Sequence, residues 1–237
     1  MVSEHHLRVQ RTARYYLLGE PREAVREIWV VCHGYGQLAS RFLHAFEPLD
    51  DGSRVVVAPE ALSRFYLTEG AGARPDARVG ASWMTKEDRL AEIEDQGRYL
   101  DAVHAEVCDR IPGPRPLHVL GFSQGVATAA RWLARGRVRA RSLVLWAGTL
   151  PPELSLDAGS VLRELDLTLV AGTGDQFATP ELVRRQEEAL EEAGVPFVLR
   201  RFEGGHRLDD DVLADVVRRA SPGADPEASR RASRESG

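Results

Sequence analysis

Ser123 lies between two glycines in the stretch GFSQG, where an apolar run ends and a helical pattern begins. A serine hydroxyl is a poor nucleophile by itself and attacks a carbonyl carbon only when a neighbouring base takes its proton. At a strand-to-helix junction, the pattern G-x-S-x-G is typical of a sharp turn that exposes the serine hydroxyl at the edge of a sheet. A five-residue pattern also occurs by chance. We predict that Ser123 is a nucleophile, which requires partners elsewhere in the chain.

An acid and a base should follow the serine, in that order. Asp175 ends the stretch GTGD, after a predicted strand and before a helix that Thr179 would cap. His206 follows two glycines in EGGH, again between a strand and a helix. The six other histidines lie in the terminal segment, in helical patterns, inside a strand or in another motif. Although most aspartates in such loops only cap turns, the order of the motifs favours Asp175 as the orienting acid and His206 as the base.

The attacked oxygen becomes negative and needs hydrogen-bond donors. The stretch HGYG follows the predicted strand 28–32 and would aim the backbone N–H of Tyr35 at the site. The second donor would be the backbone N–H of Gln124, the residue after the nucleophile. An ordinary glycine turn is the alternative interpretation. The stretches GFSQG, GTGD and GGH follow HGYG in the chain in the expected order, which favours the role as a donor. His33 is then expected to organise this loop.

Alternating strands and helices are predicted to position these residues. Apolar, β-branched runs predict buried strands at residues 28–32, 55–58, 117–120, 142–147, 167–171 and 197–202. Helical patterns cover residues 90–107, 180–193 and 209–219. The alternation predicts an α/β fold with a mostly parallel central sheet and helices on both faces. Residues 7–18 should add an antiparallel strand or a hairpin.

Length and composition favour one domain over residues 1–220, followed by a disordered tail over residues 221–237. The net charge is −5 with both signs interspersed, which gives no support for a nucleic-acid partner. Cys32 and Cys108 are too few for a disulfide framework, and no metal-spaced cluster occurs, so we expect no metal and no cofactor. We find no apolar stretch typical of a secretory signal or a bilayer span. The cytoplasm is the expected location.

The stretches HGYG, GFSQG, GTGD and GGH together resemble the α/β-hydrolase superfamily. Within it they are most similar to the carboxylesterase/phospholipase family, which includes acyl-protein thioesterases. The resemblance spans about residues 25–220. It implies the α/β-hydrolase fold, a triad of Ser123, Asp175 and His206, and oxyanion donors at Tyr35 and Gln124. The segment 62–89 is longer and differently composed than in that family, which leaves the substrate open.

Our hypothesis is a serine esterase that acts on a small acyl ester through an acyl-enzyme. An acyl thioesterase or a lysophospholipase would use the same triad. Amide hydrolysis is less favoured because we identify no peptide-binding element. A non-catalytic binding protein of this fold should have lost a triad or oxyanion position, whereas this chain retains all of them. The oligomeric state stays open.

The site should have no separate cap domain, since only about twenty residues separate the strand 142–147 from the strand that starts at Leu167. The longer insertion, residues 62–88, carries Phe65, Tyr66, Trp83 and Met84. Such side chains are typical of ligand sites and would form a shallow pocket for short to medium acyl chains. The alternative is a satellite core that only pins the loop down.

Overall fold

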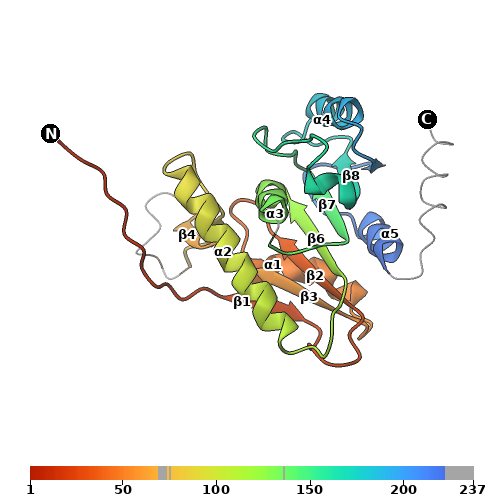
Figure 1. Ribbon diagram of the computed structural model, residues 1–237, viewed down its shortest axis with the longest axis horizontal. Helices are drawn as coiled ribbons and strands as arrows, with labels where there is room; N and C mark the ends of the chain where they lie inside the picture. Colours follow the sequence, from red (N-terminus) through yellow and green to blue (C-terminus); the bar gives the residue numbers. More distant parts are fainter. Residues whose placement is uncertain (69–73, 75, 136, 222–237) are drawn as a thin grey trace.

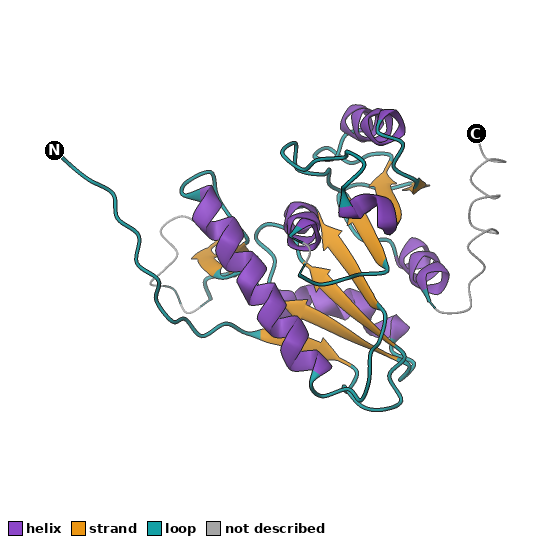
Figure 2. Ribbon diagram, in the orientation of Figure 1, coloured by secondary structure: helices purple, strands orange, loops and turns teal. Residues whose placement is uncertain are grey.

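The computed structural model describes residues 1–68, 74, 76–135 and 137–221 of the chain. Strands and helices alternate along it, as the sequence predicts (Figures 1 and 2). The strands are β1 (Tyr15–Leu18), β2 (Glu27–Cys32), β3 (Arg54–Pro59), β4 (Ser63–Tyr66), β5 (Val79–Ser82), β6 (Leu117–Phe122), β7 (Ser142–Trp146), β8 (Asp166–Gly172) and β9 (Phe197–Phe202). The α-helices are α1 (Ala39–Leu43), α2 (Arg89–Cys108), α3 (Gln124–Ala134), α4 (Pro180–Glu192) and α5 (Asp210–Ala220), and the 3-10 helices are η1 (His44–Leu49) and η3 (Val161–Glu164).

Seven of the described strands form the central sheet, in the order β1-β3-β2-β6-β7-β8-β9. Neighbouring strands run parallel, except that β1 pairs antiparallel with β3. The strand predicted within residues 7–18 is therefore the antiparallel edge strand, and the hairpin alternative is wrong because β1 pairs with β3 and not with the next strand. Parallel order brings the carboxyl ends of β2, β6, β7, β8 and β9 to one edge of the sheet.

Helices cover both faces of this sheet, which confirms the predicted layers. Val30 and Cys32 belong to an apolar cluster with residues of α2, α3 and α4. Trp29 and Val31 point to the other face and pack with residues of α1, η1 and α5. Figure 1 shows α2 and α3 in front of the sheet and α1 behind it. The connection 147–165, all of which is described, contains η3 as its one regular element, so the fold has no separate cap domain.

The predicted cap of α4 is confirmed, and α5 has a cap of the same kind. The hydroxyl of Thr179 accepts the N–H of Leu182 at 3.4 Å and caps α4. The carboxylate of Asp209 accepts the N–H of Val212 at 3.3 Å and caps α5. Gly194 follows α4 with φ 64°, a conformation that glycine adopts without strain. These ends fix where the loops before α4 and α5 begin and end.

The hairpin of β4 and β5 was not predicted. It is a separate two-stranded antiparallel sheet in which Ser63 pairs with Ser82 and Tyr66 with Val79. Its strands have four residues each, and Gly80 stands inside the second. Short strands with glycine carry little of the alternating, β-branched signal that identifies a strand in a sequence.

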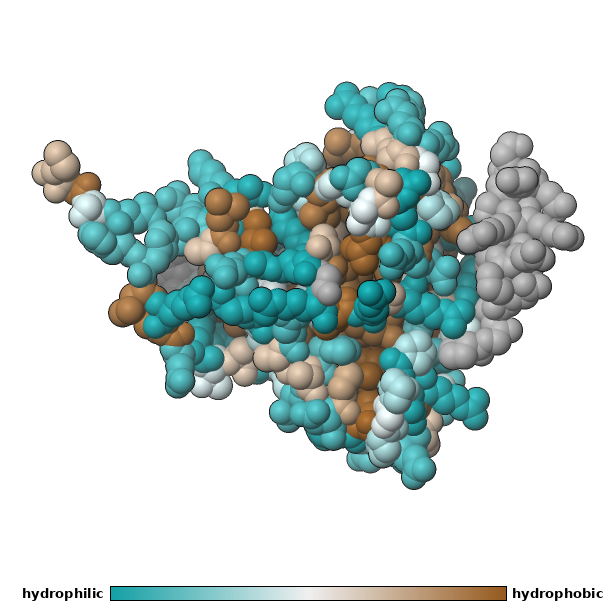
Figure 3. Space-filling view, viewed as in Figure 1, coloured by the Kyte–Doolittle hydropathy of each residue, from teal (hydrophilic) through white to brown (hydrophobic). Residues whose placement is uncertain are grey.

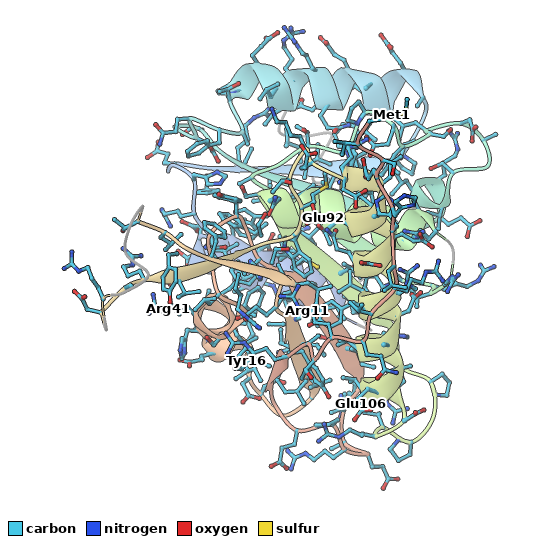
Figure 4. All side chains as sticks on the ribbon, turned by 90° about the vertical axis from the view of Figure 1, so that its left-hand side faces the viewer. Met1, Arg11, Tyr16, Arg41, Glu92 and Glu106 are labelled. Atoms are coloured by element: carbon cyan, nitrogen blue, oxygen red, sulfur yellow. The ribbon has the colours of Figure 1, made fainter. Side chains whose placement is uncertain are left out.

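The N-terminal segment runs beside α2. The hydroxyl of Tyr99 donates to the carbonyl of Arg14 at 2.6 Å, and Arg8 pairs with Glu94 at 3.5 Å. Figure 4 shows this segment leaving β1 at Tyr16 and passing Arg11. No helix in the described part of the chain is long and apolar enough to cross a bilayer. Both cysteines are free thiols.

The predicted tail, residues 221–237, lies outside the described residues except for its first residue. Ser221 Oγ lies 3.1 Å from Glu27 Oε1 and 3.0 Å from the Val217 carbonyl oxygen, so its hydroxyl can donate to either. The end of α5 is thereby attached to β2.

Candidate active site

Ser123 sits in a strained turn between β6 and α3. Its φ of 53° and ψ of −118° lie in a region that residues other than glycine rarely adopt. The Ser123 N–H donates to the carbonyl of Trp146 at 2.8 Å, which ties the turn to β7. A Cβ at Gly121 would lie 2.5 Å from the Gly125 carbonyl oxygen, and a Cβ at Gly125 would lie 2.1 Å from that of Cys32. Both glycines are needed because backbone passes directly beside them.

The structure brings Ser123, His206 and Asp175 together at the carboxyl edge of the sheet. His206 Nε2 lies 2.9 Å from Ser123 Oγ, and His206 Nδ1 lies 2.8 Å from Asp175 Oδ2. An imidazole that donates its Nδ1–H to a carboxylate has its Nε2 lone pair free to accept a proton. His206 Nε2 can therefore accept the proton of the Ser123 hydroxyl, while the Nδ1–H stays on Asp175.

The carboxylate of Asp175 is buried and held by further donors. Its Oδ1 accepts the backbone N–H groups of Phe177 at 2.8 Å and Ala178 at 2.9 Å. Burying a charge costs free energy unless it is paired and hydrogen-bonded, and these contacts together with His206 supply both. They also fix the carboxylate plane, so that the second oxygen is left for the histidine.

The loops that carry Asp175 and His206 hold each other in place. The N–H of Gly174 donates to the carbonyl of Gly204 at 2.8 Å. A Cβ at Gly172 would lie 2.5 Å from that same carbonyl oxygen. The close approach of the two loops accounts for Gly172, the first glycine of GTGD.

An aromatic ring that the sequence analysis missed borders the site. Phe177 lies with its ring centroid 4.8 Å from that of His206, and 64% of the residue is exposed. The ring centroid of Phe122 lies 5.0 Å from that of the same imidazole. Phe177 stands two residues after Asp175, and an apolar ring at an exposed loop position was the available signal. The two rings hold the imidazole and leave its Nε2 toward Ser123.

The two expected oxyanion donors lie at neighbouring strand ends. Cys32, the last residue of β2, pairs with Gly121 of β6, so the loop with Tyr35 and the start of α3 leave the sheet side by side. Gln124 is the first residue of α3, where backbone N–H groups have no acceptor inside the helix. Tyr35 is 61% exposed, and its ring centroid lies 5.1 Å from that of Phe65. The donor roles of both N–H groups stay a proposal.

His33 organises the loop that carries Tyr35. Its Nε2 accepts the Ala61 N–H at 3.1 Å, and its Nδ1 donates to the Gly34 carbonyl at 2.8 Å. Burial lowers the pKa of His33, which keeps the ring neutral. Both ring nitrogens are occupied, so His33 is not available as a base.

The four residues predicted as a pocket wall differ in burial and in their partners. Trp83 is buried, 1% exposed, and its indole N–H donates to the His33 carbonyl at 2.8 Å. Met84 is half-buried, and its carbonyl accepts the side-chain amide of Gln124 at 2.7 Å. Phe65 is half-buried against Tyr35, and Tyr66 is exposed. The alternative interpretation, a satellite core that pins the loop, describes Trp83 better.

A cavity of about 280 Å³ lies elsewhere, between the connection after β7 and helix α4. It is lined by Thr149, Leu150, Pro151, Pro152, Leu154, Leu156, Leu182, Arg185, Gln186 and Ala189. Gly148, in the same connection, is so close to the turn at Ser123 that a Cβ there would lie 2.8 Å from the Ser123 carbonyl oxygen. Figure 3 shows apolar side chains gathered between α3 and α4. The sequence analysis missed this cavity, although most of its leucines and both prolines lie within residues 150–156.

Among the described residues, one group of three possible metal ligands falls within 4.8 Å, namely Glu4, His6 and Asp88. All three are exposed, and two of them belong to the N-terminal segment. None belongs to the site around Ser123.

Comparison with solved structures decides the fold. The chain is similar to acyl-protein thioesterase 2 of Zea mays, with 20% identity and a TM-score of 0.66 over 89% of this chain and 100% of that one. The chain has the α/β-hydrolase fold. Esterase PE8 matches at 21% identity and a TM-score of 0.65, over 89% of this chain and 100% of that one. The carboxylesterase of Mesorhizobium loti matches at 17% identity and a TM-score of 0.64, over 87% of this chain and 93% of that one. No family model and no curated protein matches the sequence.

These similarities confirm the fold that the four motifs imply. At such identities the shared property is the fold, and the chemistry of the site rests on its own residues.

Proposed function

We propose that the protein is a serine hydrolase that cleaves carboxylic esters of small molecules. The observation that carries the proposal is the hydrogen-bonded row of Ser123, His206 and Asp175, with distances of 2.9 and 2.8 Å, at a strained turn. Strain and a buried carboxylate both cost stability, and they commonly persist where function requires them. The esterases and the thioesterase of similar structure support the same class of reaction.

In the proposed reaction, His206 Nε2 takes the proton as Ser123 Oγ attacks the acyl carbon. The oxygen of the tetrahedral intermediate accepts the N–H groups of Tyr35 and Gln124. His206 then gives the proton to the departing alcohol. Water repeats the sequence on the acyl-enzyme and releases the acid. Asp175 stays ionised throughout and holds the imidazole in the tautomer that the reaction needs.

The proposed substrates carry short to medium acyl chains, and the acyl group is assigned to the cavity beside α4. Its volume of about 280 Å³ is slightly below the range of typical ligand sites, about 300–1,000 Å³. A longer chain would leave methylenes in water, and each of these forgoes about 0.8 kcal/mol of burial. The proposal places the reaction in the cytoplasm, without a nucleic-acid partner.

Thioester hydrolysis is the alternative, because one of the similar structures is named an acyl-protein thioesterase and the same triad serves both leaving groups. Lysophospholipase activity would use the same residues. A binding protein without activity is disfavoured because no triad position is replaced.

A substrate panel tests the proposal. Purified protein is assayed against p-nitrophenyl esters from acetate to decanoate and against acyl thioesters of the same chains, with Ser123→Ala as the blank. The proposal expects ester hydrolysis that peaks at short to medium chains and is lost in the blank. Higher kcat/KM for the thioesters would favour the alternative. Equal activity of Ser123→Ala, or no activity toward any substrate, would show that the proposal is wrong.

A further inference from the structure

We infer that β5 and Trp83 align the two oxyanion donors, so that Gly80, Ala81 and Trp83 are positioning residues of the site. The inference rests on the proposed function, because it assigns a task to the hairpin that flanks the proposed donors. It replaces the expectation that Trp83 contacts the acyl chain.

The first half of the argument is the contact between β5 and the loop that carries Tyr35. The Gly36 N–H donates to the Ala81 carbonyl at 2.9 Å, and the Ala81 N–H donates to the Gln37 carbonyl at 3.1 Å. The two backbones lie so close that a Cβ at Gly80 would be 2.4 Å from the Gly36 carbonyl oxygen. The residues that follow Tyr35 are therefore fixed to β5.

Trp83 fixes the residue on the other side of the loop. Its indole N–H donates to the His33 carbonyl at 2.8 Å, and its ring lies 5.1 Å from the His33 imidazole. The peptide N–H of Tyr35 thus lies between two anchored positions, one at His33 and one at Gly36. The carbonyl of that peptide, on Gly34, accepts His33 Nδ1 at 2.8 Å and the Gln37 N–H at 3.2 Å. The segment 80–83 therefore holds His33 and Gln37, the two residues that hold this peptide.

The second half is the contact between the same segment and the nucleophile turn. The side-chain carbonyl of Gln124 accepts the backbone N–H of Trp83 at 3.0 Å. Its NH₂ group donates to the Met84 carbonyl at 2.7 Å. Trp83 therefore contacts both donor-bearing loops, one with its indole and the other with its backbone.

The segment is itself anchored to the scaffold. The side-chain amide of Gln96, a buried residue of α2, donates to the Trp83 carbonyl. Trp83 is thereby held to α2 and to both loops. This arrangement allows residues that do not touch the substrate to determine the distance between the two N–H groups.

Alignment of this kind has a large catalytic effect. Loss of one oxyanion donor costs about 10²- to 10³-fold in kcat, and a misplacement of about 1 Å can cost about 10²-fold. The donors act on the charge that develops in the transition state, so that kcat should respond more than KM.

Three variants test the inference. Trp83→Phe keeps a ring but removes the indole N–H, and Gly80→Ala pushes the backbone of Gly36 away. Gln124→Glu keeps its acceptor for the Trp83 N–H but loses the donor to Met84. Gly159→Ala is the control, because the nearest atom to its new Cβ is an ordinary 3.6 Å away in a different loop.

Each variant is measured for kcat, KM, melting temperature and the Ki of a trifluoromethyl ketone, which forms a tetrahedral oxyanion on the nucleophile. We expect kcat to fall about 10- to 100-fold with KM little changed in the three variants. The Ki of the ketone should rise by the same factor as kcat/KM falls. The control should keep all four values.

Wild-type kcat and Ki in the folded variants would overturn the inference. A loss of activity that follows melting, with the ratio of Ki to KM unchanged, would also overturn it, since that is the result of a structural role alone. If one variant does not fold, the other two decide. The proposed function has its own test: it is wrong if Ser123→Ala keeps its activity. If Ser123→Ala is inactive but Gly80→Ala, Trp83→Phe and Gln124→Glu behave like the wild type, only the inference about alignment is wrong.

Discussion

Asp175→Asn should inactivate the protein while leaving it folded. The substitution keeps the size of the side chain but makes it neutral and gives it an NH₂ group. Oδ1 of Asp175 faces two backbone N–H donors, at 2.8 and 2.9 Å, so the amide oxygen must take that place. The NH₂ group then points at His206 Nδ1, which can only accept from it. The imidazole proton moves to Nε2 and points at Ser123 Oγ, so that the base can no longer take the hydroxyl proton.

The expected loss is about 10⁴-fold in kcat, the value for the same change in a serine protease triad. Each factor of ten corresponds to about 1.36 kcal/mol, so the barrier rises by about 5.4 kcal/mol. The free energy of unfolding should fall by no more than about 3 kcal/mol, because neutral hydrogen bonds replace charge-assisted ones at the same donors.

The assay is kcat on the best ester of the panel, with Ser123→Ala for the background and urea unfolding for stability. Asp209→Asn is the matched control, because Asp209 caps α5 and asparagine caps a helix as well as aspartate does. The control should keep its turnover. A folded Asp175→Asn with wild-type turnover would refute the reasoning and point to another acid, with Asp209 and Asp210 next to be tested.

Three further predictions follow from packing, charge and the cavity. Gly125→Ala would place a Cβ 2.1 Å from the Cys32 carbonyl oxygen and should lower the free energy of unfolding in urea by at least about 1–3 kcal/mol; wild-type stability would contradict this. Burial lowers the pKa of His118, so His118 binds a proton more readily in the unfolded chain than in the folded one. The free energy of unfolding should therefore decrease as the pH is lowered below about 6.5, and an equal dependence on pH in wild type and His118→Gln would contradict this. Ala189→Phe should fill the cavity beside α4 and shift ester preference to shorter chains, whereas an unchanged profile would place the acyl group elsewhere.

Much of the fold could be predicted because the signals are local. The β-branched runs of the central strands reflect burial on both faces of a parallel sheet. The cap at Thr179 acts within three residues of chain, so the sequence around it is sufficient. The triad could be proposed because each member stands at the end of a predicted strand, and parallel strands end at one edge.

The hairpin and its contacts could not be predicted, since they depend on distant parts of the chain. Gly80 is required by the backbone of Gly36, 44 positions away, and nothing in the local pattern shows that contact. An aromatic residue in a loop insertion fits a pocket wall and a buried anchor equally well. The partner of the Trp83 indole, the His33 carbonyl, is 50 positions distant, so the local sequence does not show that Trp83 is an anchor.

Labelling with a fluorophosphonate tests the central claim, that Ser123 is the nucleophile, most directly. The protein is treated with the probe, and mass spectrometry locates the adduct in wild type and in Ser123→Ala. We predict one adduct, on the peptide that contains Ser123, and none in the variant. Equal labelling of the two proteins, or an adduct on another residue, would contradict the account.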